Sequence, residues 1–319
     1  MGKLIAAMAS SHAYTFLEPK VWDDRRGQTR SHYKHRFGVE PPDQPQVAEE
    51  TLEANESRYG KIRDGLNFLR DKINALRPDV LLVIGDDQNE NFLENNLPQF
   101  SIYVGKELVA AFRDGRTGQR YRCDADAAWT ILEQCVESGI DLAYSTEFPK
   151  DHLISHAHRE PLEYLQLNGN LAIVPIFINA IHVPAPTPAR CYQFGETLRK
   201  VIGSLPAEKR VMIYASGGLS HFSAGYPWNH YKGPCTLGSI CQDFDRKILA
   251  WMQDGRGREL ARLSNQDLIQ NGEIELRQWI TLMGMIGDCK PELLTYEPFY
   301  RGLLGMAVGY WDLASAESA

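Results

Sequence analysis

The sequence predicts an α/β fold in which one β-sheet is covered by helices on both faces. Two observations lead to this prediction. Short apolar runs with strand character alternate with segments of helical periodicity. Three of the apolar runs are also followed by clusters of polar residues, as is usual in α/β proteins. We expect one domain over residues 1–319, because no linker or internal repeat divides the chain.

Five apolar runs are predicted to be buried strands. Each is rich in residues that favour strands and ends near glycine, proline or polar residues. The runs are Leu4–Met8, Val80–Ile84, Ser101–Val104, Ala172–Ile178 and Val211–Ala215. Because helical segments lie between them, we expect helices on both faces of the sheet.

Helices are predicted where apolar side chains recur at three- and four-residue steps. One stripe, which stops before Pro78, consists of Ile62, Leu66, Leu69, Ile73 and Leu76. Asp124 is a candidate cap for a second helix. That helix is expected to bury Trp129, Leu132 and Val136. A third stripe consists of Ile240, Phe244, Ile248 and Trp251.

Two polar segments are predicted to form loops over the site. The longer segment, Asp23–Gln46, is charged and contains prolines, and a compact domain seldom carries such a stretch without a use. Lys150–Glu160 is the second candidate lid. His32 and His35 lie in the basic part of the first segment, where we expect solvated side chains rather than ligands.

Composition limits the classes of function. The net charge of −7 argues against nucleic acid or an anionic membrane as the main partner. No apolar run approaches the length of a membrane span, and the N-terminus lacks a signal sequence, so we expect a cytoplasmic protein. The scattered cysteines predict free thiols, without a disulfide framework or zinc knuckle. They are Cys123, Cys135, Cys191, Cys235, Cys241 and Cys289.

Polar clusters follow three of the predicted strands directly. They are Ser10–His12, Asp86–Gln88 and Ser216–His221. An oxygen-activating Fe(II) site typically uses two imidazoles and one carboxylate on one face of the metal. His12 is a candidate ligand because it stands at a strand end and other polar clusters are expected nearby. The chain has no phosphate-binding loop and no GxSxG motif, which leaves a nucleotide cofactor or a serine-hydrolase triad without support.

Four motifs occur in a fixed order along the chain. They are Ser-Ser-His at 10–12, Asp-Asp-x-x-x-x-Phe at 86–92, Gly-Gly-Leu-Ser-His at 217–221 and Glu-Leu-x-x-Trp at 275–279. With these motifs, nearly the whole chain resembles the class III extradiol ring-cleavage dioxygenases of the LigB type. That family includes the catalytic subunit of protocatechuate 4,5-dioxygenase and the gallate dioxygenases. The resemblance implies a single LigB-like domain whose central mixed β-sheet is flanked by helices.

The resemblance also implies an activity and a ligand set. The activity is oxidative cleavage of a catecholic or phenolic aromatic acid by O2 at a non-haem Fe(II). His12 matches the first iron-binding histidine of the family, and Glu275 matches the iron-binding carboxylate. Glu273 is a rival for the second role, but the Glu-Leu-x-x-Trp spacing selects Glu275.

Two further histidines are assigned catalytic roles by the resemblance. His221 matches the residue that acts as acid and base beside the metal, and an imidazole suits proton transfer near neutral pH. Gly217-Gly218 is expected to turn the backbone sharply and bring His221 to the substrate. His156 matches an additional active-site histidine that binds substrate or transfers a proton. His182, just past a strand, is a candidate for substrate contact.

One position departs from the family pattern. Phe92 sets the register, and Gln88 then stands where the family has its second metal histidine. An amide oxygen is a neutral and weaker donor than imidazole. Side chains alternate along a strand, so Asp86 is expected to share a face with Gln88 while Asp87 points away. Asp86 is therefore a candidate substitute ligand, and a loop histidine could also complete the site: His152, His156 or His158. Asp86 and Asp87 are also candidates for substrate contact.

The substitution leaves two other functions open. A site poorer in imidazole is compatible with Mn or Zn and with non-oxidative hydrolysis or decarboxylation of a phenolic compound. A non-catalytic paralogous subunit is the other alternative. The presence of His12, His221 and Glu275 favours the dioxygenase. As partners we expect a small aromatic substrate and O2, and either a homodimer or a complex with a small helical subunit.

Overall fold

All five predicted strands form, and they belong to one sheet of eight strands. The computed structural model describes residues 1–110, 119–148, 154–166, 171–223, 225–226 and 228–314. The predicted strands are β1 (Lys3–Ser10), β2 (Val80–Gly85), β3 (Phe100–Tyr103), β7 (Ala172–Ile178) and β8 (Arg210–Ser216). The strand order is β6-β3-β7-β2-β8-β1-β10-β9. The prediction of an α/β fold is thereby confirmed.

The sheet is mixed, with a parallel centre. β7, β2, β8 and β1 run parallel, whereas β10 pairs antiparallel with β1 and with β9. The strands that the sequence pattern did not reveal are β6 (Ala143–Ser145), β9 (Leu293–Phe299) and β10 (Leu304–Asp312). A separate two-stranded sheet joins β4 (Glu107–Ala110) to β5 (Gln119–Arg122). Proline and glycine interrupt β9 and β10 and weaken their strand signature.

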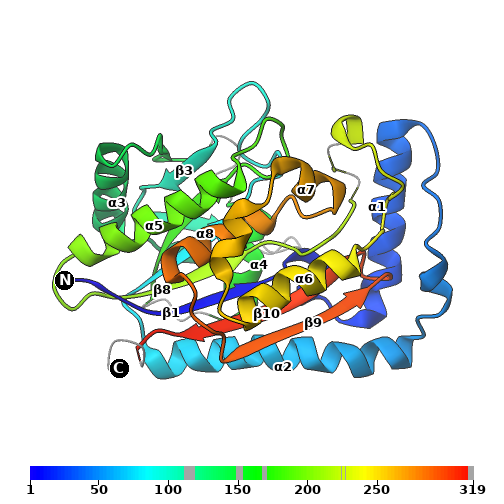
Figure 1. Ribbon diagram of the computed structural model, residues 1–319, viewed down its shortest axis with the longest axis horizontal. Helices are drawn as coiled ribbons and strands as arrows, with labels where there is room; N and C mark the ends of the chain where they lie inside the picture. The colour runs from blue at the N-terminus through cyan, green and yellow to red at the C-terminus, as the bar shows by residue number, and fades with distance from the viewer. Residues whose placement is uncertain (111–118, 149–153, 167–170, 224, 227, 315–319) are drawn as a thin grey trace.

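Helices cover both faces of the sheet, as predicted (Figure 1). Side chains alternate along β2, so that Leu82 and Ile84 enter one hydrophobic core and Leu81 and Val83 enter the other. On one side lie α3 (Ala125–Glu137), α5 (Pro188–Ser204) and α8 (Leu276–Ile286). On the other lie α2 (Leu52–Leu76), which packs on β9 and β10, and α4 (His156–Tyr164). The remaining helices are α1 (Trp22–Phe37), α6 (Gln242–Gln253) and α7 (Asn265–Gln270).

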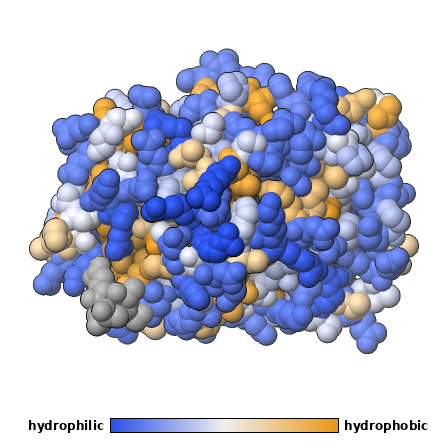
Figure 2. Space-filling model, viewed as in Figure 1, coloured by the Kyte–Doolittle hydropathy of each residue, from blue (hydrophilic) through white to orange (hydrophobic). Residues whose placement is uncertain are grey.

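The surface of the molecule is mainly polar. The face shown in Figure 2 is mostly polar, with apolar residues in separate small groups. Among the helices of the described ranges, none has both the length and the apolar character needed to cross a membrane. All six cysteines are free, as predicted.

The buried face of α3 differs from the prediction. Asp124 does cap the helix, because its side chain accepts a hydrogen bond from the Ala127 N–H. Leu132 is buried, but Trp129 is 39% exposed and Val136 is 52% exposed. The helix instead turns a neighbouring stripe inward, which also includes Ala127, Ala128, Ile131 and Cys135. Both stripes have helical spacing, so only the packing of the helix on the sheet decides which one is buried.

The expected loop over Asp23–Gln46 is in fact mainly helical. α1 occupies Trp22–Phe37 and stands at one end of the sheet (Figure 1). Acidic Asp23 and Asp24 lie in its first turn and basic residues lie in its last, an arrangement that suits the helix dipole. The helix is polar on nearly all sides, so it lacks the apolar stripe from which helices are predicted. His32 and His35 are exposed on it, as expected.

The second expected lid is also mainly helical among its described residues, 154–160. Residues 156–160 belong to α4, which contacts β2 and β8. His152 and the rest of 149–153 lie outside the described residues. His158 is fully buried against Gly85, so it does not belong to a surface loop.

The α5–α8 contact depends on Gly195 of α5 and Gly284 of α8, which allow the two helices to approach closely. A Cβ atom on Gly284 would lie 2.1 Å from the Tyr192 carbonyl oxygen, whereas one on Gly203 of α5 would meet nothing within 4 Å. We expect Gly284→Ala to lower the free energy of unfolding by about 1–3 kcal/mol, because the helices must move apart. Gly203→Ala is the control and should be neutral or stabilising, by up to about 1 kcal/mol. Denaturant unfolding measures both, and equal effects would contradict the close-packing explanation.

Candidate metal centre

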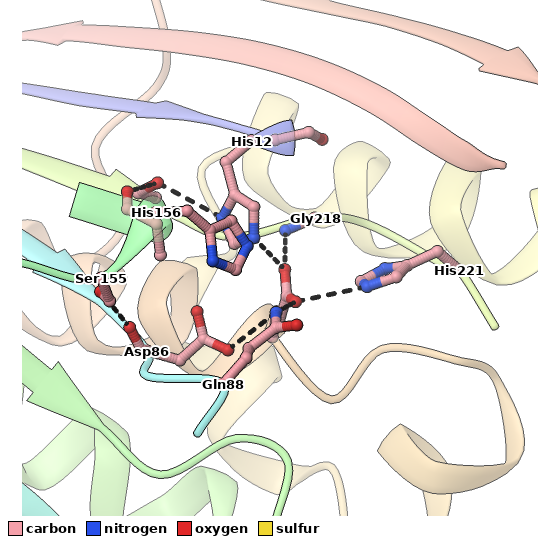
Figure 3. A network of polar contacts seen from close by, with 12 residues as sticks. His12, Asp86, Gln88, Ser155, His156, Gly218 and His221 are labelled. Carbon is pink, nitrogen blue, oxygen red and sulfur yellow. Dashed lines mark hydrogen bonds and ion pairs between the residues drawn. The ribbon is translucent and has the colours of Figure 1, made fainter. Parts of the chain in front are cut away.

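The predicted polar clusters meet at the carboxyl ends of three parallel strands. His12 follows β1, Asp86 follows β2, and the segment to His221 follows β8. Glu275 directly precedes α8 and completes the group. Figure 3 shows His12, Asp86, Gln88, His156 and His221 pointing toward one another. An inner cavity of about 100 Å³ lies among them, and its wall includes His12, Tyr14, Thr29, Gln88, His156, His221 and Glu275.

The surroundings of His12 select its tautomer. Its Nδ1 lies 3.4 Å from the Ser216 Oγ, whose hydrogen is donated to the Ala157 carbonyl. This arrangement favours a hydrogen on His12 Nδ1, and burial lowers the pKa of the ring. Nε2 of the neutral ring then presents a lone pair 3.4 Å from the Glu275 Oε2. This approach of a ring nitrogen to a carboxylate oxygen is favourable when a proton or a metal cation lies between them.

Glu275 is held as a buried, charged carboxylate. Its Oε2 accepts a hydrogen bond of 2.7 Å from the Gly218 N–H, and its Oε1 accepts one of 2.8 Å from Gln88 Nε2. Burial would raise its pKa, but positive charge on the rings of His12 and His221, together with the hydrogen bonds from His221 and the Gly218 N–H, outweighs burial and lowers the pKa. The geometry thus brings Glu275, and not its rival Glu273, to His12.

Gly217 and Gly218 have a different role from the one predicted. Neither has the left-handed backbone that would make glycine necessary for a sharp turn. A Cβ on Gly217 would lie 2.5 Å from the Glu275 carbonyl oxygen, and one on Gly218 would lie 2.9 Å from His221 Nδ1. Glycine is required here because the backbone passes directly against Glu275 and His221.

Asp86 lies close to the other candidate ligands and lacks a full set of partners. Its Oδ2 accepts a 3.3 Å hydrogen bond from Gln88 Nε2, while its buried Oδ1 has no hydrogen-bond partner among the described residues. Burial, followed by the negative charge of Glu275, raises the pKa of Asp86 well above its ordinary range. Two carboxylates buried so close together, those of Asp86 and Glu275, repel each other unless a cation neutralises them.

The donor set fits a divalent cation. One ligand atom from each of His12, Asp86 and Glu275 lies within 4.8 Å of the other two. All three side chains are at most 3% exposed. Two carboxylates and one neutral imidazole supply two negative charges, which balance a divalent ion. Gln88 turns its amide nitrogen toward both carboxylates, so in this structure it is a hydrogen-bond donor to the candidate ligands.

His221 lies beside the candidate ligands with one ring nitrogen engaged. Its Nδ1 lies 2.8 Å from the Leu219 carbonyl oxygen and must carry the hydrogen of that bond. Its Nε2 lies 3.3 Å from the Glu275 Oε1 and lines the cavity. Burial would lower the pKa of His221, but the charge and hydrogen bond of Glu275 raise it to about 9. A cation bound by Glu275 would neutralise part of the carboxylate charge and so lower the pKa of His221 again.

His156 forms an ion pair at the cavity wall. Glu90 Oε1 lies 2.8 Å from both the Nδ1 and the backbone nitrogen of His156. Burial would lower the pKa of His156, but Glu90 outweighs it and raises the pKa to about 9. The ring packs edge-on against His12 with 5.0 Å between centroids. Sequence reasoning missed Glu90, although it lies inside the Asp-Asp-x-x-x-x-Phe motif.

Three other predicted residues lie outside the inner cavity. Asp87, predicted to contact substrate, instead accepts hydrogen bonds from the backbone N–H groups of residues 90–92, so we correct its role to loop stabilisation. His158 contacts the Ile176 carbonyl and Ser155, and burial lowers its pKa to about 4. His182 lines a separate outer cavity of about 690 Å³, where its Nε2 lies 2.6 Å from Asn89 Oδ1.

A buried network supports the segment that carries His221. Ser220 donates its backbone N–H and its hydroxyl to the two carboxylate oxygens of Asp245, at 3.1 and 2.8 Å. Tyr296 donates to the same carboxylate at 2.5 Å. The Cys241 N–H in turn donates to Ser220 Oγ at 2.8 Å. Because Ser220 directly precedes His221, this network limits the movement of the imidazole.

Fold and site together define an α/β protein with a buried imidazole–carboxylate cluster at the ends of its parallel strands. Residues 44–310 match the family model described as the catalytic LigB subunit of aromatic ring-opening dioxygenase. The chain therefore belongs to the LigB family, and the resemblance seen in its motifs is confirmed.

Curated relatives carry names of the same class. A 2,3-dihydroxyphenylpropionate/2,3-dihydroxicinnamic acid 1,2-dioxygenase from Klebsiella pneumoniae is 31% identical over 158 residues, which is 48% of this chain and 46% of the relative. The chain thus spans about half the length of that relative. A protein of the same name from Mycolicibacterium smegmatis is 24% identical over 78% of this chain and 89% of its own.

A solved structure also aligns along the chain. An uncharacterized protein from Escherichia coli K12 covers 96% of this chain and 99% of its own, with a TM-score of 0.48 and 10% identity. This likeness is too distant to bear on function.

Proposed function

We propose that this protein is a metal-dependent extradiol dioxygenase that opens the ring of a catecholic aromatic acid with O2. The observation that carries the proposal is the convergence of His12, Asp86 and Glu275, with His221 beside them, in a member of the LigB family. The names of the relatives suggest a dihydroxyphenyl acid as substrate.

The metal would be held by His12, Asp86 and Glu275. Fe(II) is the metal we propose, with Mn(II) or Zn(II) as alternatives, and when bound it would transfer electron density between the aromatic ring and O2. Gln88 donates to both carboxylates and thereby holds them in place. An oxygen-rich donor set also suits harder cations such as Mn(II).

His221 would transfer protons, and His156 would stabilise negative charge. His221 keeps a hydrogen on Nδ1 for Leu219, so Nε2 is the atom that would accept a proton from a substrate hydroxyl and later return it. His156, charged beside Glu90, would stabilise negative charge that develops on the substrate oxygens. Both imidazoles line the cavity of about 100 Å³, where a bound substrate would meet them.

Oxygen uptake tests the proposed reaction. The purified chain is loaded with Fe(II) without oxygen, and it is then mixed with O2 and a panel of catechols that includes 2,3-dihydroxyphenylpropionate. We expect one O2 consumed per ring opened and a yellow ring-opened product. Binding of metal and catechol without oxygen consumption would overturn the proposal.

A non-oxidative reaction is the second candidate. It is favoured by the carboxylate of Asp86 in a position where an imidazole was expected to bind the metal. Turnover of a phenolic acid by the Mn(II)- or Zn(II)-loaded protein in the absence of oxygen would support it. Whether the protein acts as a homodimer or with a small helical subunit stays a prediction.

A further inference from the structure

Two thiols lie together in the segment that follows His221. Cys235 Sγ and Cys241 Sγ are 3.9 Å apart, and both side chains are partly exposed. Cys123, Cys135 and Cys191 are buried, and burial raises the pKa of each of these thiols to about 12. Only accessible thiols with thiolate character react readily with oxidants. We therefore expect Cys235 and Cys241 to react with oxidants more readily than the three buried thiols.

The surroundings of the pair favour a thiolate at Cys235. The hydrogen bond from the Cys241 thiol lowers the pKa of Cys235 to about 6, and contacts with Tyr231 and Ser239 add to it. The same interaction raises the pKa of Cys241, which stays a thiol and acts as the donor. Cys241 is also the N-cap residue of α6, a helix of 12 residues whose N-terminal dipole favours nearby negative charge.

Both cysteines are connected to the segment that carries His221. The Cys241 N–H donates to Ser220 Oγ at 2.8 Å, one residue before His221. The Cys235 N–H donates to the Tyr231 hydroxyl at 2.6 Å. The Tyr231 ring packs against Phe222, with 5.1 Å between ring centroids, one residue after His221. A change in the distance between the two sulfurs would therefore move the residues on both sides of His221, Ser220 and Phe222.

We propose that Cys235 and Cys241 are a peroxide-reactive dithiol that closes to a reversible disulfide. The Cys235 thiolate attacks one oxygen of hydrogen peroxide and the O–O bond breaks, so that Cys235 becomes a sulfenic acid and the other oxygen leaves as hydroxide, which takes up a proton to become water. Cys241 sulfur then attacks the Cys235 sulfur, the S–O bond breaks, and water leaves. The two sulfurs lose two electrons in total, and peroxide is reduced to water. A dithiol reductant reverses the reaction by exchange.

Thiol counting after peroxide treatment tests the proposal on the full chain. We expect the native protein to lose two of its six thiols and two hydrogen atoms in mass, with a peptide linking Cys235 to Cys241. Dithiothreitol should restore both thiols. In Cys241→Ser the reaction should stop at a Cys235 sulfenic acid, which dimedone traps.

Cys289→Ser is the matched control, because Cys289 is also partly exposed but burial raises the pKa of its thiol. After peroxide treatment, Cys289→Ser should still lose two thiols to the Cys235–Cys241 disulfide. Cys235→Ser should form no such disulfide. If the native protein keeps all six thiols at peroxide concentrations that oxidise a free cysteine peptide, the proposal is wrong. Oxidation at Cys289 in preference to the pair would also overturn it. These measurements need no catalytic assay, so their outcome is independent of the ring-cleavage proposal.

Discussion

Asp86→Asn is expected to weaken divalent metal binding by at least about 100-fold and to stabilise the metal-free protein. The amide keeps the shape of the side chain but removes one of the two charges that would balance the cation. Loss of supporting groups around protein metal sites typically costs about 10–100-fold in affinity, and loss of a ligand should cost more. Metal competition with a fluorescent chelator measures the affinity without any need for activity.

The stabilisation follows from the raised pKa of Asp86. Burial and the charge of Glu275 raise the pKa of this carboxyl above its value in the unfolded chain. At any pH above the unfolded pKa, the unfolded state releases the proton more readily, so the raised pKa costs stability. An amide has no proton to release and avoids this cost. Melting curves at neutral pH without metal should show a higher midpoint for Asp86→Asn, and added metal should raise the midpoint of the native protein only.

Gln88→Met is the control that separates the two candidate ligands. Methionine has similar length but removes the amide that donates to Asp86 and Glu275. We expect a loss of metal affinity of about 10–100-fold at most, as for a supporting residue. A larger loss in Gln88→Met than in Asp86→Asn would show that Gln88 is the ligand and Asp86 the support.

His221→Asn is expected to lower kcat by about 10²–10⁴-fold while metal binding is retained. The asparagine amide can still donate to the Leu219 carbonyl and hold the segment, as His221 Nδ1 does. It lacks the group at Nε2 that would move the substrate proton. Steady-state oxygen uptake gives kcat, and the chelator competition confirms that the metal site is intact.

His182→Asn is the matched control for this variant. His182 lines the outer cavity, away from Glu275, and we expect its replacement to leave kcat within a few fold. If His182 contacts the substrate, as predicted from the sequence, its replacement should raise KM. A His221→Asn protein with normal kcat would show that another group transfers the proton.

Much of the site could be predicted from the sequence because its residues stand directly at strand ends. Parallel strands bring their carboxyl ends to one edge of a sheet, so His12 and His221 were expected to approach each other once the strands were recognised. The family's Glu-Leu-x-x-Trp motif selected Glu275 over Glu273, and the structure shows what its tryptophan does. Trp279 is buried and donates to the Gly217 carbonyl, which ties α8 to the end of β8.

Other features could not be read from local patterns. α1 has no apolar stripe, and its helical structure follows from end charges and from the packing of Trp22. β10 is rich in glycine, yet it is buried because β1 and β9 pair with it on both sides. Both elements form because of their tertiary neighbours, which periodicity does not reveal.

The sequence by itself determined the α/β class, the five strands and the identity of the polar residues at the strand ends. Periodicity and order along the chain are local properties, so they need no coordinates. Only the tertiary structure decided that Asp86 faces His12 and Glu275 while Gln88 turns its amide nitrogen toward the carboxylates, and that Cys235 meets Cys241. These facts depend on side-chain direction and on which loops pack together, and neither property is encoded in spacing along the chain.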